Sequence, residues 1–135
     1  MHFLRLYYWI LYAAYINDPM AEVTRYTHKE ELAFRFMHYI IEEHSPDKDV
    51  TYYARKLGLS AKSLTNLIRS ISGQSARDWI VFYTIFEIKT LLRDSSLDIK
   101  AIAARTHFPD HATLSRYFRR YTGMTPTKYR ESFFF

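Results

Sequence analysis

The sequence contains no cysteine, only three glycines and only four prolines. The lack of cysteine excludes disulfides, thiolate zinc sites and cysteine nucleophiles, and it is compatible with a reducing cytoplasm. Because glycine and proline are so scarce, few positions force a helix to end. Alternating runs of β-branched residues, which predict strands, are also missing. We therefore expect an all-α fold and a cytoplasmic location.

The usual signatures of enzymes are missing as well. No phosphate-cradling glycine loop and no nucleophile elbow occurs in the sequence. His107 and His111 are four residues apart but straddle a turn that contains proline, so they do not share a helical face as zinc ligands do. Neighbouring carboxylates such as Glu30 and Glu31 are typical of solvated helix faces. We therefore expect a protein that is not an enzyme and that uses no metal and no cofactor.

The charge is distributed unevenly along the chain. Residues 1–49 carry five Lys/Arg against eight Asp/Glu, whereas residues 50–135 carry fourteen against six. The net charge of +5 therefore comes from the C-terminal part. A basic segment beside an acidic one is typical of a polyanion-binding domain joined to a segment of another kind.

The N-terminal segment differs from the rest in being densely apolar. Residues 2–16 contain many aromatic side chains and a single charge, on Arg5. The run is too short to span a bilayer, no small-residue cleavage site follows it, and a membrane-surface helix would carry more Lys/Arg. We therefore expect residues 1–26 to form a helix that contacts protein and not a membrane, either in a homodimer or against a sensor domain.

Capping and stop residues divide the remaining chain into helices. Ser, Thr and Asp accept hydrogen bonds at helix N-termini, and Gly adopts the left-handed conformation that ends helices. By these signals we expect helices at about 27–44, 49–57, 61–72, 75–93, 99–106, 111–122 and 127–131. Helical periodicity directs several apolar side chains inward, namely Leu32, Phe36, Ile40, Leu64, Leu67, Ile68, Ile71, Leu114, Phe118 and Tyr121. The apolar residues of the helix at 75–93 extend well beyond one stripe, so we expect it to be packed on more than one side.

An internal repeat is the most informative feature of the sequence. Residues 50–73 align with residues 99–123, so that Ala54 falls on Ala103 and both copies end in glycine. Each copy predicts a short helix, a tight turn and a longer helix, which is the pattern of a helix-turn-helix. A plain bundle of helical hairpins would explain one copy as well. Two copies in tandem favour two homeodomain-like helix-turn-helix subdomains joined by a linker helix, with extra N-terminal helices.

The outward positions of the two longer helices carry side chains suited to DNA. Short hydrogen-bonding and cationic groups that can reach base edges in the major groove are Lys62, Ser63, Thr65, Asn66, His111, Thr113, Ser115 and Arg116. Groups expected to contact phosphates are Ser60, Arg69, Ser75, Arg77, Arg119, Arg120 and Lys128. We therefore expect helices 61–72 and 111–122 to be recognition helices, and a linker of about 27 Å to let them enter successive major-groove segments.

Two stretches resemble a known family. LDIKAIAARTHFPDHATLSRYFRRYTGMTPTKYR at 97–130 resembles the C-terminal signature of the AraC/XylS transcription regulators, and ARKLGLSAKSLTNLIRSISG resembles the first helix-turn-helix of the same domain. The linker sequence ARDWIVFYTIFEIKTLL is similar to that of regulators from Bacteroides-like bacteria. The sequence departs from the family at His107, where Gly or Asn is usual, at Ala112, where Ser is usual, and at Leu114, where an aromatic is usual.

The resemblance implies a domain organisation and partners. It implies a bipartite DNA-binding domain over 27–135, with a first unit at 27–73, the linker helix at 75–93 and a second unit at 97–131. Its partner would be double-stranded promoter DNA, and such domains often contact RNA polymerase. Residues 1–26 would then be the end of a sensor or dimerisation region. A protein-interaction module without DNA binding is the main alternative class.

Overall fold

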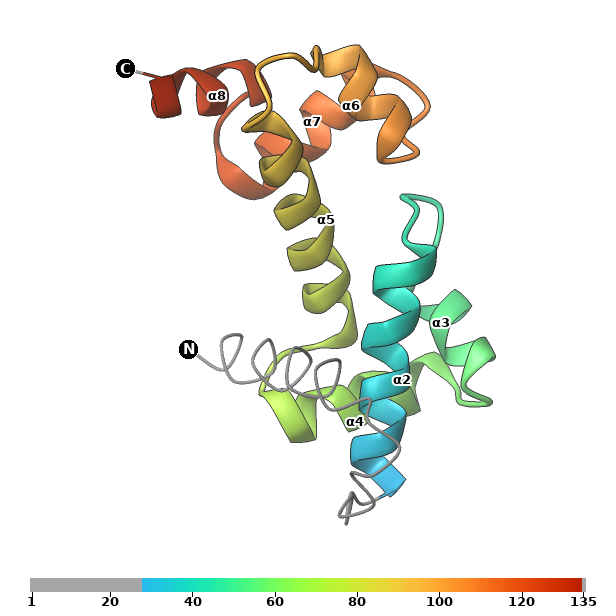
Figure 1. Cartoon of the computed structure of the whole chain (residues 1–135). Helices are drawn as coiled ribbons and strands as arrows, with labels where there is room; N and C mark the ends of the chain where they lie inside the picture. Colours follow the sequence, from blue (N-terminus) through green and yellow to red (C-terminus); the bar gives the residue numbers. More distant parts are fainter. Residues whose placement is uncertain (1–27, 135) are drawn as a thin grey trace, which may run out of the picture. The chain divides into compact units, whose positions relative to one another are not determined.

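The computed structural model describes residues 28–134, and all regular structure in this range is α-helical (Figure 1). The helices are α2 (His28–Glu43), α3 (Val50–Lys56), α4 (Ala61–Ser72), α5 (Ala76–Leu92), α6 (Ile99–Arg105), α7 (His111–Thr122) and α8 (Pro126–Phe134). The expected all-α fold is confirmed. No helix among these residues is long and apolar enough to cross a membrane. The helix expected within 1–26 lies outside the described residues.

The chain forms two compact units, and the boundary between them falls inside α5, after Ile80. In the first unit α3 and α4 form a helix-turn-helix, and α2 packs against both of them (Figure 1). Its core contains Phe36, Ile40, Tyr53 and Ile68, none of which is exposed to solvent. The rings of Phe36 and Tyr53 meet edge to face at 5.8 Å, which joins α2 to α3.

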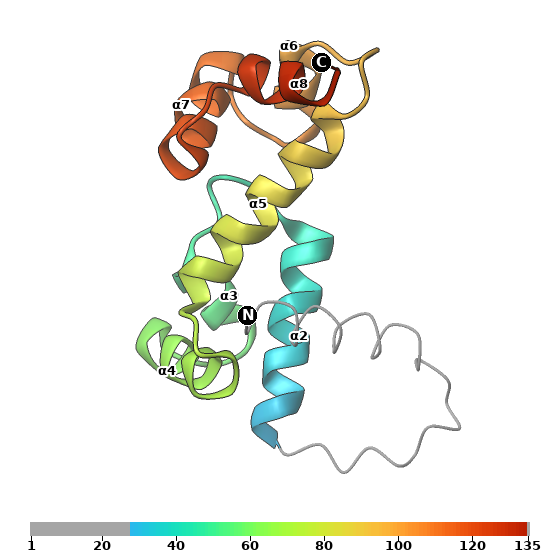
Figure 2. The ribbon, with the colours of Figure 1, turned by 90° about the vertical axis from the view of Figure 1, so that its left-hand side faces the viewer.

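The second unit repeats this arrangement. Helices α6 and α7 form its helix-turn-helix, and α8 packs against α7 (Figure 2). The core contains Ile102, Leu114 and Phe118 together with Ile88 and Leu92 from α5. Both copies of the repeat therefore bury the same positions, because Leu64 and Ile68 in the first unit correspond to Leu114 and Phe118 in the second.

The helix ends confirm the predicted capping chemistry. The carboxylate of Asp49 accepts a hydrogen bond from the amide of Tyr52 at 3.1 Å, and that of Asp98 accepts one from Ala101 at 2.7 Å. At the other end, Gly73 closes α4 with a φ of 79°, and Gly123 closes α7 with a φ of 76°. Local chemistry of this kind fixes where α3 and α6 begin and where α4 and α7 end.

Two of the side chains predicted to be buried are not. Ile71 is 38% exposed and Tyr121, at the same place in the second copy, is 37% exposed. The inward position in the last turn of α4 is occupied by Ser72, whose hydroxyl donates to the carbonyl of Ile68 at 2.7 Å and accepts from the indole nitrogen of Trp79 at 2.9 Å. These two hydrogen bonds satisfy the Ser72 hydroxyl, so this small polar side chain can be buried. The stripe of buried apolar side chains on α4 therefore ends one turn earlier than predicted.

The linker helix α5 is buried on more than one side, but part of its apolar surface is exposed. Trp79, Ile88 and Leu92 of α5 are buried, but Phe82 and Phe86 are 38% and 44% exposed. Their rings stack on each other at 6.5 Å. Trp79 and Ile88 are nine residues apart, which at 3.6 residues per turn places them on opposite sides of α5. Helix α5 is therefore buried on more than one side, as predicted.

Helix α8 extends three residues beyond the predicted end at 131. Its aromatic side chains lie against the basic C-terminal end of α5, with Lys89 over the ring of Tyr129 at 5.3 Å and Arg93 over the ring of Phe133 at 5.2 Å. Arg130 donates to the carbonyl of Leu92 at 2.9 Å. These contacts hold the extra turn of α8, because cations placed over aromatic faces are attracted to them.

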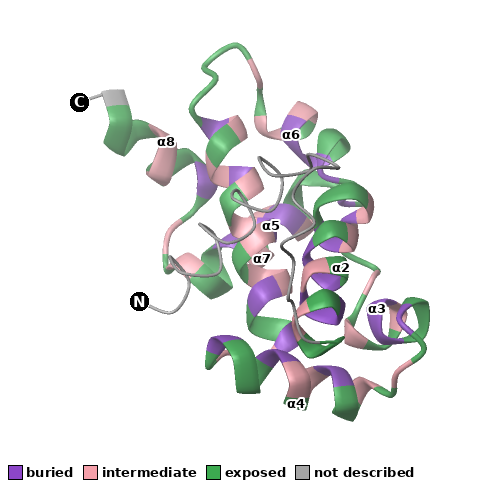
Figure 3. Ribbon diagram, turned by 60° about the horizontal axis from the view of Figure 1, so that its bottom comes forward, coloured by how far each residue is buried: buried purple, intermediate pink, exposed green. Residues whose placement is uncertain are grey.

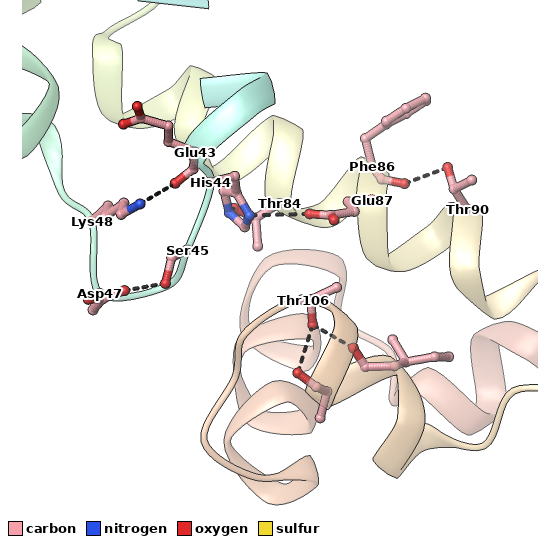
Figure 4. Close-up of polar contacts among 12 residues, drawn as sticks. Glu43, His44, Ser45, Asp47, Lys48, Thr84, Phe86, Glu87, Thr90 and Thr106 are labelled. Carbon is pink, nitrogen blue, oxygen red and sulfur yellow. Dashed lines mark hydrogen bonds and ion pairs between the residues drawn. The ribbon is translucent and has the colours of Figure 1, made fainter. Parts of the chain in front are cut away.

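Polar contacts fasten the segment between α2 and α3. Lys56 forms an ion pair with Glu43, and the hydroxyl of Tyr52 donates to Glu43 at 2.7 Å. The hydrogen bond from Lys56, and then that from Tyr52, lowers the pKa of Glu43 below its ordinary value. The buried imidazole of His44 lies 2.5 Å from the hydroxyl of Thr84 and 3.2 Å from the carboxylate of Glu87, both on α5 (Figure 4).

The turns of the two repeats differ at one backbone position. Gly58 has a φ of 71°, and the corresponding residue of the second copy, His107, has a φ of 63°. A side chain in this left-handed region costs about 1–2 kcal/mol unless the residue is glycine. His107 is therefore the strained member of the pair, and it is exposed to solvent.

Substitutions at these two turn positions should change the free energy of unfolding in opposite directions. We expect His107→Gly to raise the free energy of unfolding by about 0.5–1 kcal/mol, since relief of strain exceeds the added entropy of the unfolded chain. Gly58→Ala should lower it by about 1–2 kcal/mol through backbone strain alone, because an added Cβ would meet nothing within 4 Å. Chemical denaturation measures both changes, and a destabilised His107→Gly variant would contradict this account.

Candidate nucleic-acid interface

Helix α4 presents one polar face to solvent. The serine hydroxyl of Ser60 caps it by accepting a hydrogen bond from the amide of Ser63 at 3.0 Å. Leu64 and Ile68 turn the opposite face into the core, so α4 has one buried and one exposed side (Figure 3). Of the predicted DNA-contacting residues on this helix, Lys62, Ser63, Asn66 and Arg69 are exposed and Thr65 is half-buried. The exposed side chains are hydrogen-bonding or cationic, as base and phosphate contacts require.

Helix α7 is arranged in the same way but carries more positive charge. Asp110 caps it by accepting from the amide of Thr113 at 2.7 Å. Of the predicted residues on this helix, His111, Arg116, Arg119 and Arg120 are exposed, and Thr113 and Ser115 are half-buried. The three arginines lie within two turns, and the guanidinium of Arg120 lies over the ring of Tyr121 at 5.4 Å. Planar guanidinium groups suit both guanine edges and phosphates.

The remaining phosphate candidates lie at the starts of α5 and α8. The hydroxyl of Ser75 accepts from the amide of Asp78 at 3.1 Å, and the carboxylate of Asp78 accepts from the amide of Ser75 at 3.2 Å, which completes a reciprocal cap. Arg77 is exposed beside this cap. Lys128 is exposed in the first turn of α8, where its amide donates to Thr125 at 3.2 Å. Helix N-termini of this kind add positive potential near each cationic side chain.

One residue that sequence reasoning did not include among the site residues is Asp110. Hydrogen bonds from the backbone amide and then the hydroxyl of Thr113 lower its pKa, and the charges of Arg116 and His111 lower it further. The guanidinium of Arg116 in turn donates to the hydroxyl of Thr113 at 3.4 Å. The spacing of three residues between these positions is the available sequence signal, since it places all three on one face of the first turns.

The arrangement of His, Asp and Glu side chains, in the part of the chain that the structure describes, differs from that of a metal site. Among the described residues, no group of three or more His, Asp or Glu side chains is placed to hold a metal ion. Each unit instead exposes one polar and basic helix face, on the side opposite its apolar core. Such a face can form hydrogen bonds and ion pairs with a polyanion.

Comparison with known proteins agrees with this geometry. Residues 53–132, more than half of the chain, match the family model described as a helix-turn-helix domain. The transcriptional activator RhaR of Yersinia pseudotuberculosis serotype O:3 (strain YPIII) is 36% identical over 85 residues, which are 63% of this chain. The chain spans 29% of the length of that relative.

Solved structures show the same fold. The DNA-binding domain of AdpA, a global transcriptional factor solved in complex with a target DNA, has a TM-score of 0.64 at 24% identity and covers 76% of this chain and 91% of its own. An AraC-type regulator from Chromobacterium violaceum has a TM-score of 0.61 at 17% identity and covers 75% and 90%. The tandem repeat, its helical geometry and the family match lead to one conclusion: the chain belongs to the AraC/XylS-type helix-turn-helix family of DNA-binding transcription regulators.

Proposed function

We propose that the chain binds a specific double-stranded promoter sequence, with α4 and α7 as recognition helices in successive major-groove segments, and thereby regulates transcription. The observation that carries the proposal is that two equivalent helices each bury one face and expose a hydrogen-bonding, basic face. A single αα-hairpin could serve other purposes, but the duplication of both the scaffold and the exposed chemistry fits a bipartite DNA site.

Within this proposal the exposed residues have two tasks. The side chains that face the bases are Lys62, Ser63, Thr65 and Asn66 on α4 and His111, Ser115 and Arg116 on α7, and Thr113 lies among them on α7. Phosphates are contacted by the remaining candidates, Ser60, Arg69, Ser75, Arg77, Arg119, Arg120 and Lys128. Base contacts supply the sequence preference, whereas phosphate contacts set affinity and register without reading sequence.

Further partners belong to the same proposal. The relative RhaR is called a transcriptional activator, which supports a contact of this chain with RNA polymerase in the cytoplasm. Residues 2–16 would join the chain to a second copy or to a sensor domain. Membership of a Bacteroides-like subgroup rests on the linker sequence alone.

Removing one base-reading side chain should flatten the preference at one position of the site. Arg116 and Asn66 lie at equivalent places in the repeat, and both are exposed. A bidentate contact from arginine to guanine or from asparagine to adenine discriminates by about 1–3 kcal/mol. We therefore expect Arg116→Ala and Asn66→Ala each to relax one base position, in different halves of the site. Selection of binding sites from random duplexes measures this.

Arg120→Ala is the matched control, because it removes the same charge from the same helix. If Arg120 contacts phosphate, this variant should weaken binding to all sequences alike and leave the selected sequence unchanged. A selection on Arg116→Ala that returned the preference of the unmodified chain at every position would assign Arg116 to phosphate binding instead. Failure of the unmodified chain to enrich any sequence would contradict the proposed function.

A further inference from the structure

The two recognition helices begin with different capping chemistry, although they occupy equivalent places in the repeat. Helix α4 begins with Ser60, whose hydroxyl donates to that of Ser63 at 2.9 Å. Helix α7 begins with Asp110, and Thr113 stands at the place of Ser63. The second helix therefore has a carboxylate where the first has a neutral hydroxyl, although either residue type caps a helix well.

In α7 the cap is connected to the arginine that is proposed to read a base. The carboxylate of Asp110 accepts from the amide of Thr113 at 2.7 Å, and the Thr113 hydroxyl accepts from the Arg116 guanidinium at 3.4 Å. Asp110 and Arg116 form no ion pair with each other within the described part of the chain. The Asp110 carboxylate and the Arg116 guanidinium therefore contact the same residue, Thr113, the first at its backbone amide and the second at its hydroxyl.

We propose that Thr113 is a positioning residue, whose backbone amide is held by Asp110 and whose hydroxyl holds the Arg116 guanidinium ready for one guanine edge. This inference rests on the proposed function. A free arginine must lose the freedom of several torsions before it can form two parallel hydrogen bonds with a base, and a side chain already held near that geometry loses less. Thr113 then sharpens the preference at the base that Arg116 contacts, without contacting a base itself. The pKa of Asp110, which its Thr113 contacts lower, keeps this carboxyl ionised around neutral pH.

The test compares Thr113→Val with Thr113→Ser. Valine keeps the shape and removes the hydroxyl, whereas serine keeps the hydroxyl. We expect Thr113→Val to reduce the preference for guanine at the Arg116 position by about 2- to 10-fold, which corresponds to the loss of one hydrogen bond. Thr113→Ser should retain that preference. Ser63→Ala is the matched control from the first unit, and it should leave the Arg116 position unchanged.

A second measurement uses the free chain. Arginine side-chain nitrogen signals in NMR should show slower rotation of the Arg116 guanidinium in the unmodified chain and in Thr113→Ser than in Thr113→Val. If Thr113 has a purely structural role, Thr113→Val will lower the thermal midpoint of unfolding. It will not change the rotation of the Arg116 guanidinium or the preference at one base position alone.

Three results would overturn the inference. The first is an unchanged preference in Thr113→Val at the position that Arg116→Ala flattens, which would leave the proposed function intact. The second is the loss of preference at a different position, which would show that Thr113 itself reads a base. The third is the absence of any preferred sequence for the unmodified chain, in which case the proposed function fails and this inference fails with it.

Discussion

Raising the salt concentration fourfold, from about 50 to about 200 mM, is expected to weaken binding to the preferred duplex by about 500-fold. Five exposed cations are proposed to contact phosphates, namely Arg69, Arg77, Arg119, Arg120 and Lys128. Each releases a counterion from DNA, at a log-log slope of about 0.9 per contact, so the total slope should be near −4.5. Fluorescence anisotropy with a labelled duplex measures the slope directly.

Removing two of these cations should change the slope by a defined amount. The double variant Arg119→Gln, Arg120→Gln should bind with a slope about 1.8 units less steep. The control variant Lys29→Gln, Arg35→Gln removes the same charge from exposed positions of α2, and it should leave the slope unchanged. A flat response of the unmodified chain over this salt range would contradict the electrostatic part of the proposed function.

Phe118→Ala should cause the largest loss of stability of any single substitution in the second unit. The Phe118 ring is fully buried between the helix-turn-helix and α8, where it meets Tyr129 edge to face at 5.5 Å. Truncating a buried phenylalanine typically costs about 3–5 kcal/mol, through lost transfer free energy and the cavity that remains. This is a large fraction of the total stability of an ordinary domain, about 5–15 kcal/mol. Denaturation followed by circular dichroism measures the loss.

The equivalent position in the first unit provides the matched comparison. Ile68→Ala removes a fully buried side chain from the corresponding turn of α4, and it should cost about 2–5 kcal/mol. Native-state hydrogen exchange should show the largest loss of protection in α6 and α7 for Phe118→Ala and in α3 and α4 for Ile68→Ala. A loss below about 1 kcal/mol for Phe118→Ala would show that the cavity collapses or that the core does not depend on this ring.

The helix ends are predictable from the sequence because they depend on neighbours in the chain. The capping residues Asp49, Ser60 and Asp98 and the closing residues Gly73 and Gly123 act within one turn, so their effect needs no knowledge of tertiary structure. The repeat could be found for the same reason, since each copy carries its own start and stop.

The inward faces are less predictable where polar side chains replace apolar ones. Ser72 and Thr106 are buried, yet each hydroxyl donates to a carbonyl one turn earlier, at Ile68 and Ile102. A hydroxyl satisfied in this way can occupy a core position without a change in the hydrophobic pattern. Thr84 is similar, because its partner His44 lies 40 residues away in the sequence. Only tertiary structure reveals such pairs.

The same limit applies to the candidate site. Helical periodicity predicts that Lys62, Asn66 and Arg116 are exposed, because the apolar positions leave one face to solvent. The route from Asp110 through Thr113 to Arg116 depends on side-chain torsions, which the sequence does not determine. The extent of α8 escaped prediction because it depends on contacts with Lys89 of α5 and with Arg93, which directly follows α5.

Helix α5 is uninterrupted from Ala76 to Leu92 and supplies buried side chains to both units, Trp79 to the first and Leu92 to the second. Most helical stability in proteins comes from tertiary packing, so the packing of α5 in each core also favours the helical conformation of the part that belongs to the other unit. The unfolding of the two units is then coupled, because melting of one unit removes packing that keeps α5 helical and so lowers the stability of the other. Calorimetry should therefore give a single heat-absorption peak, and fragments that end or begin near Ile80 should each melt below the intact chain.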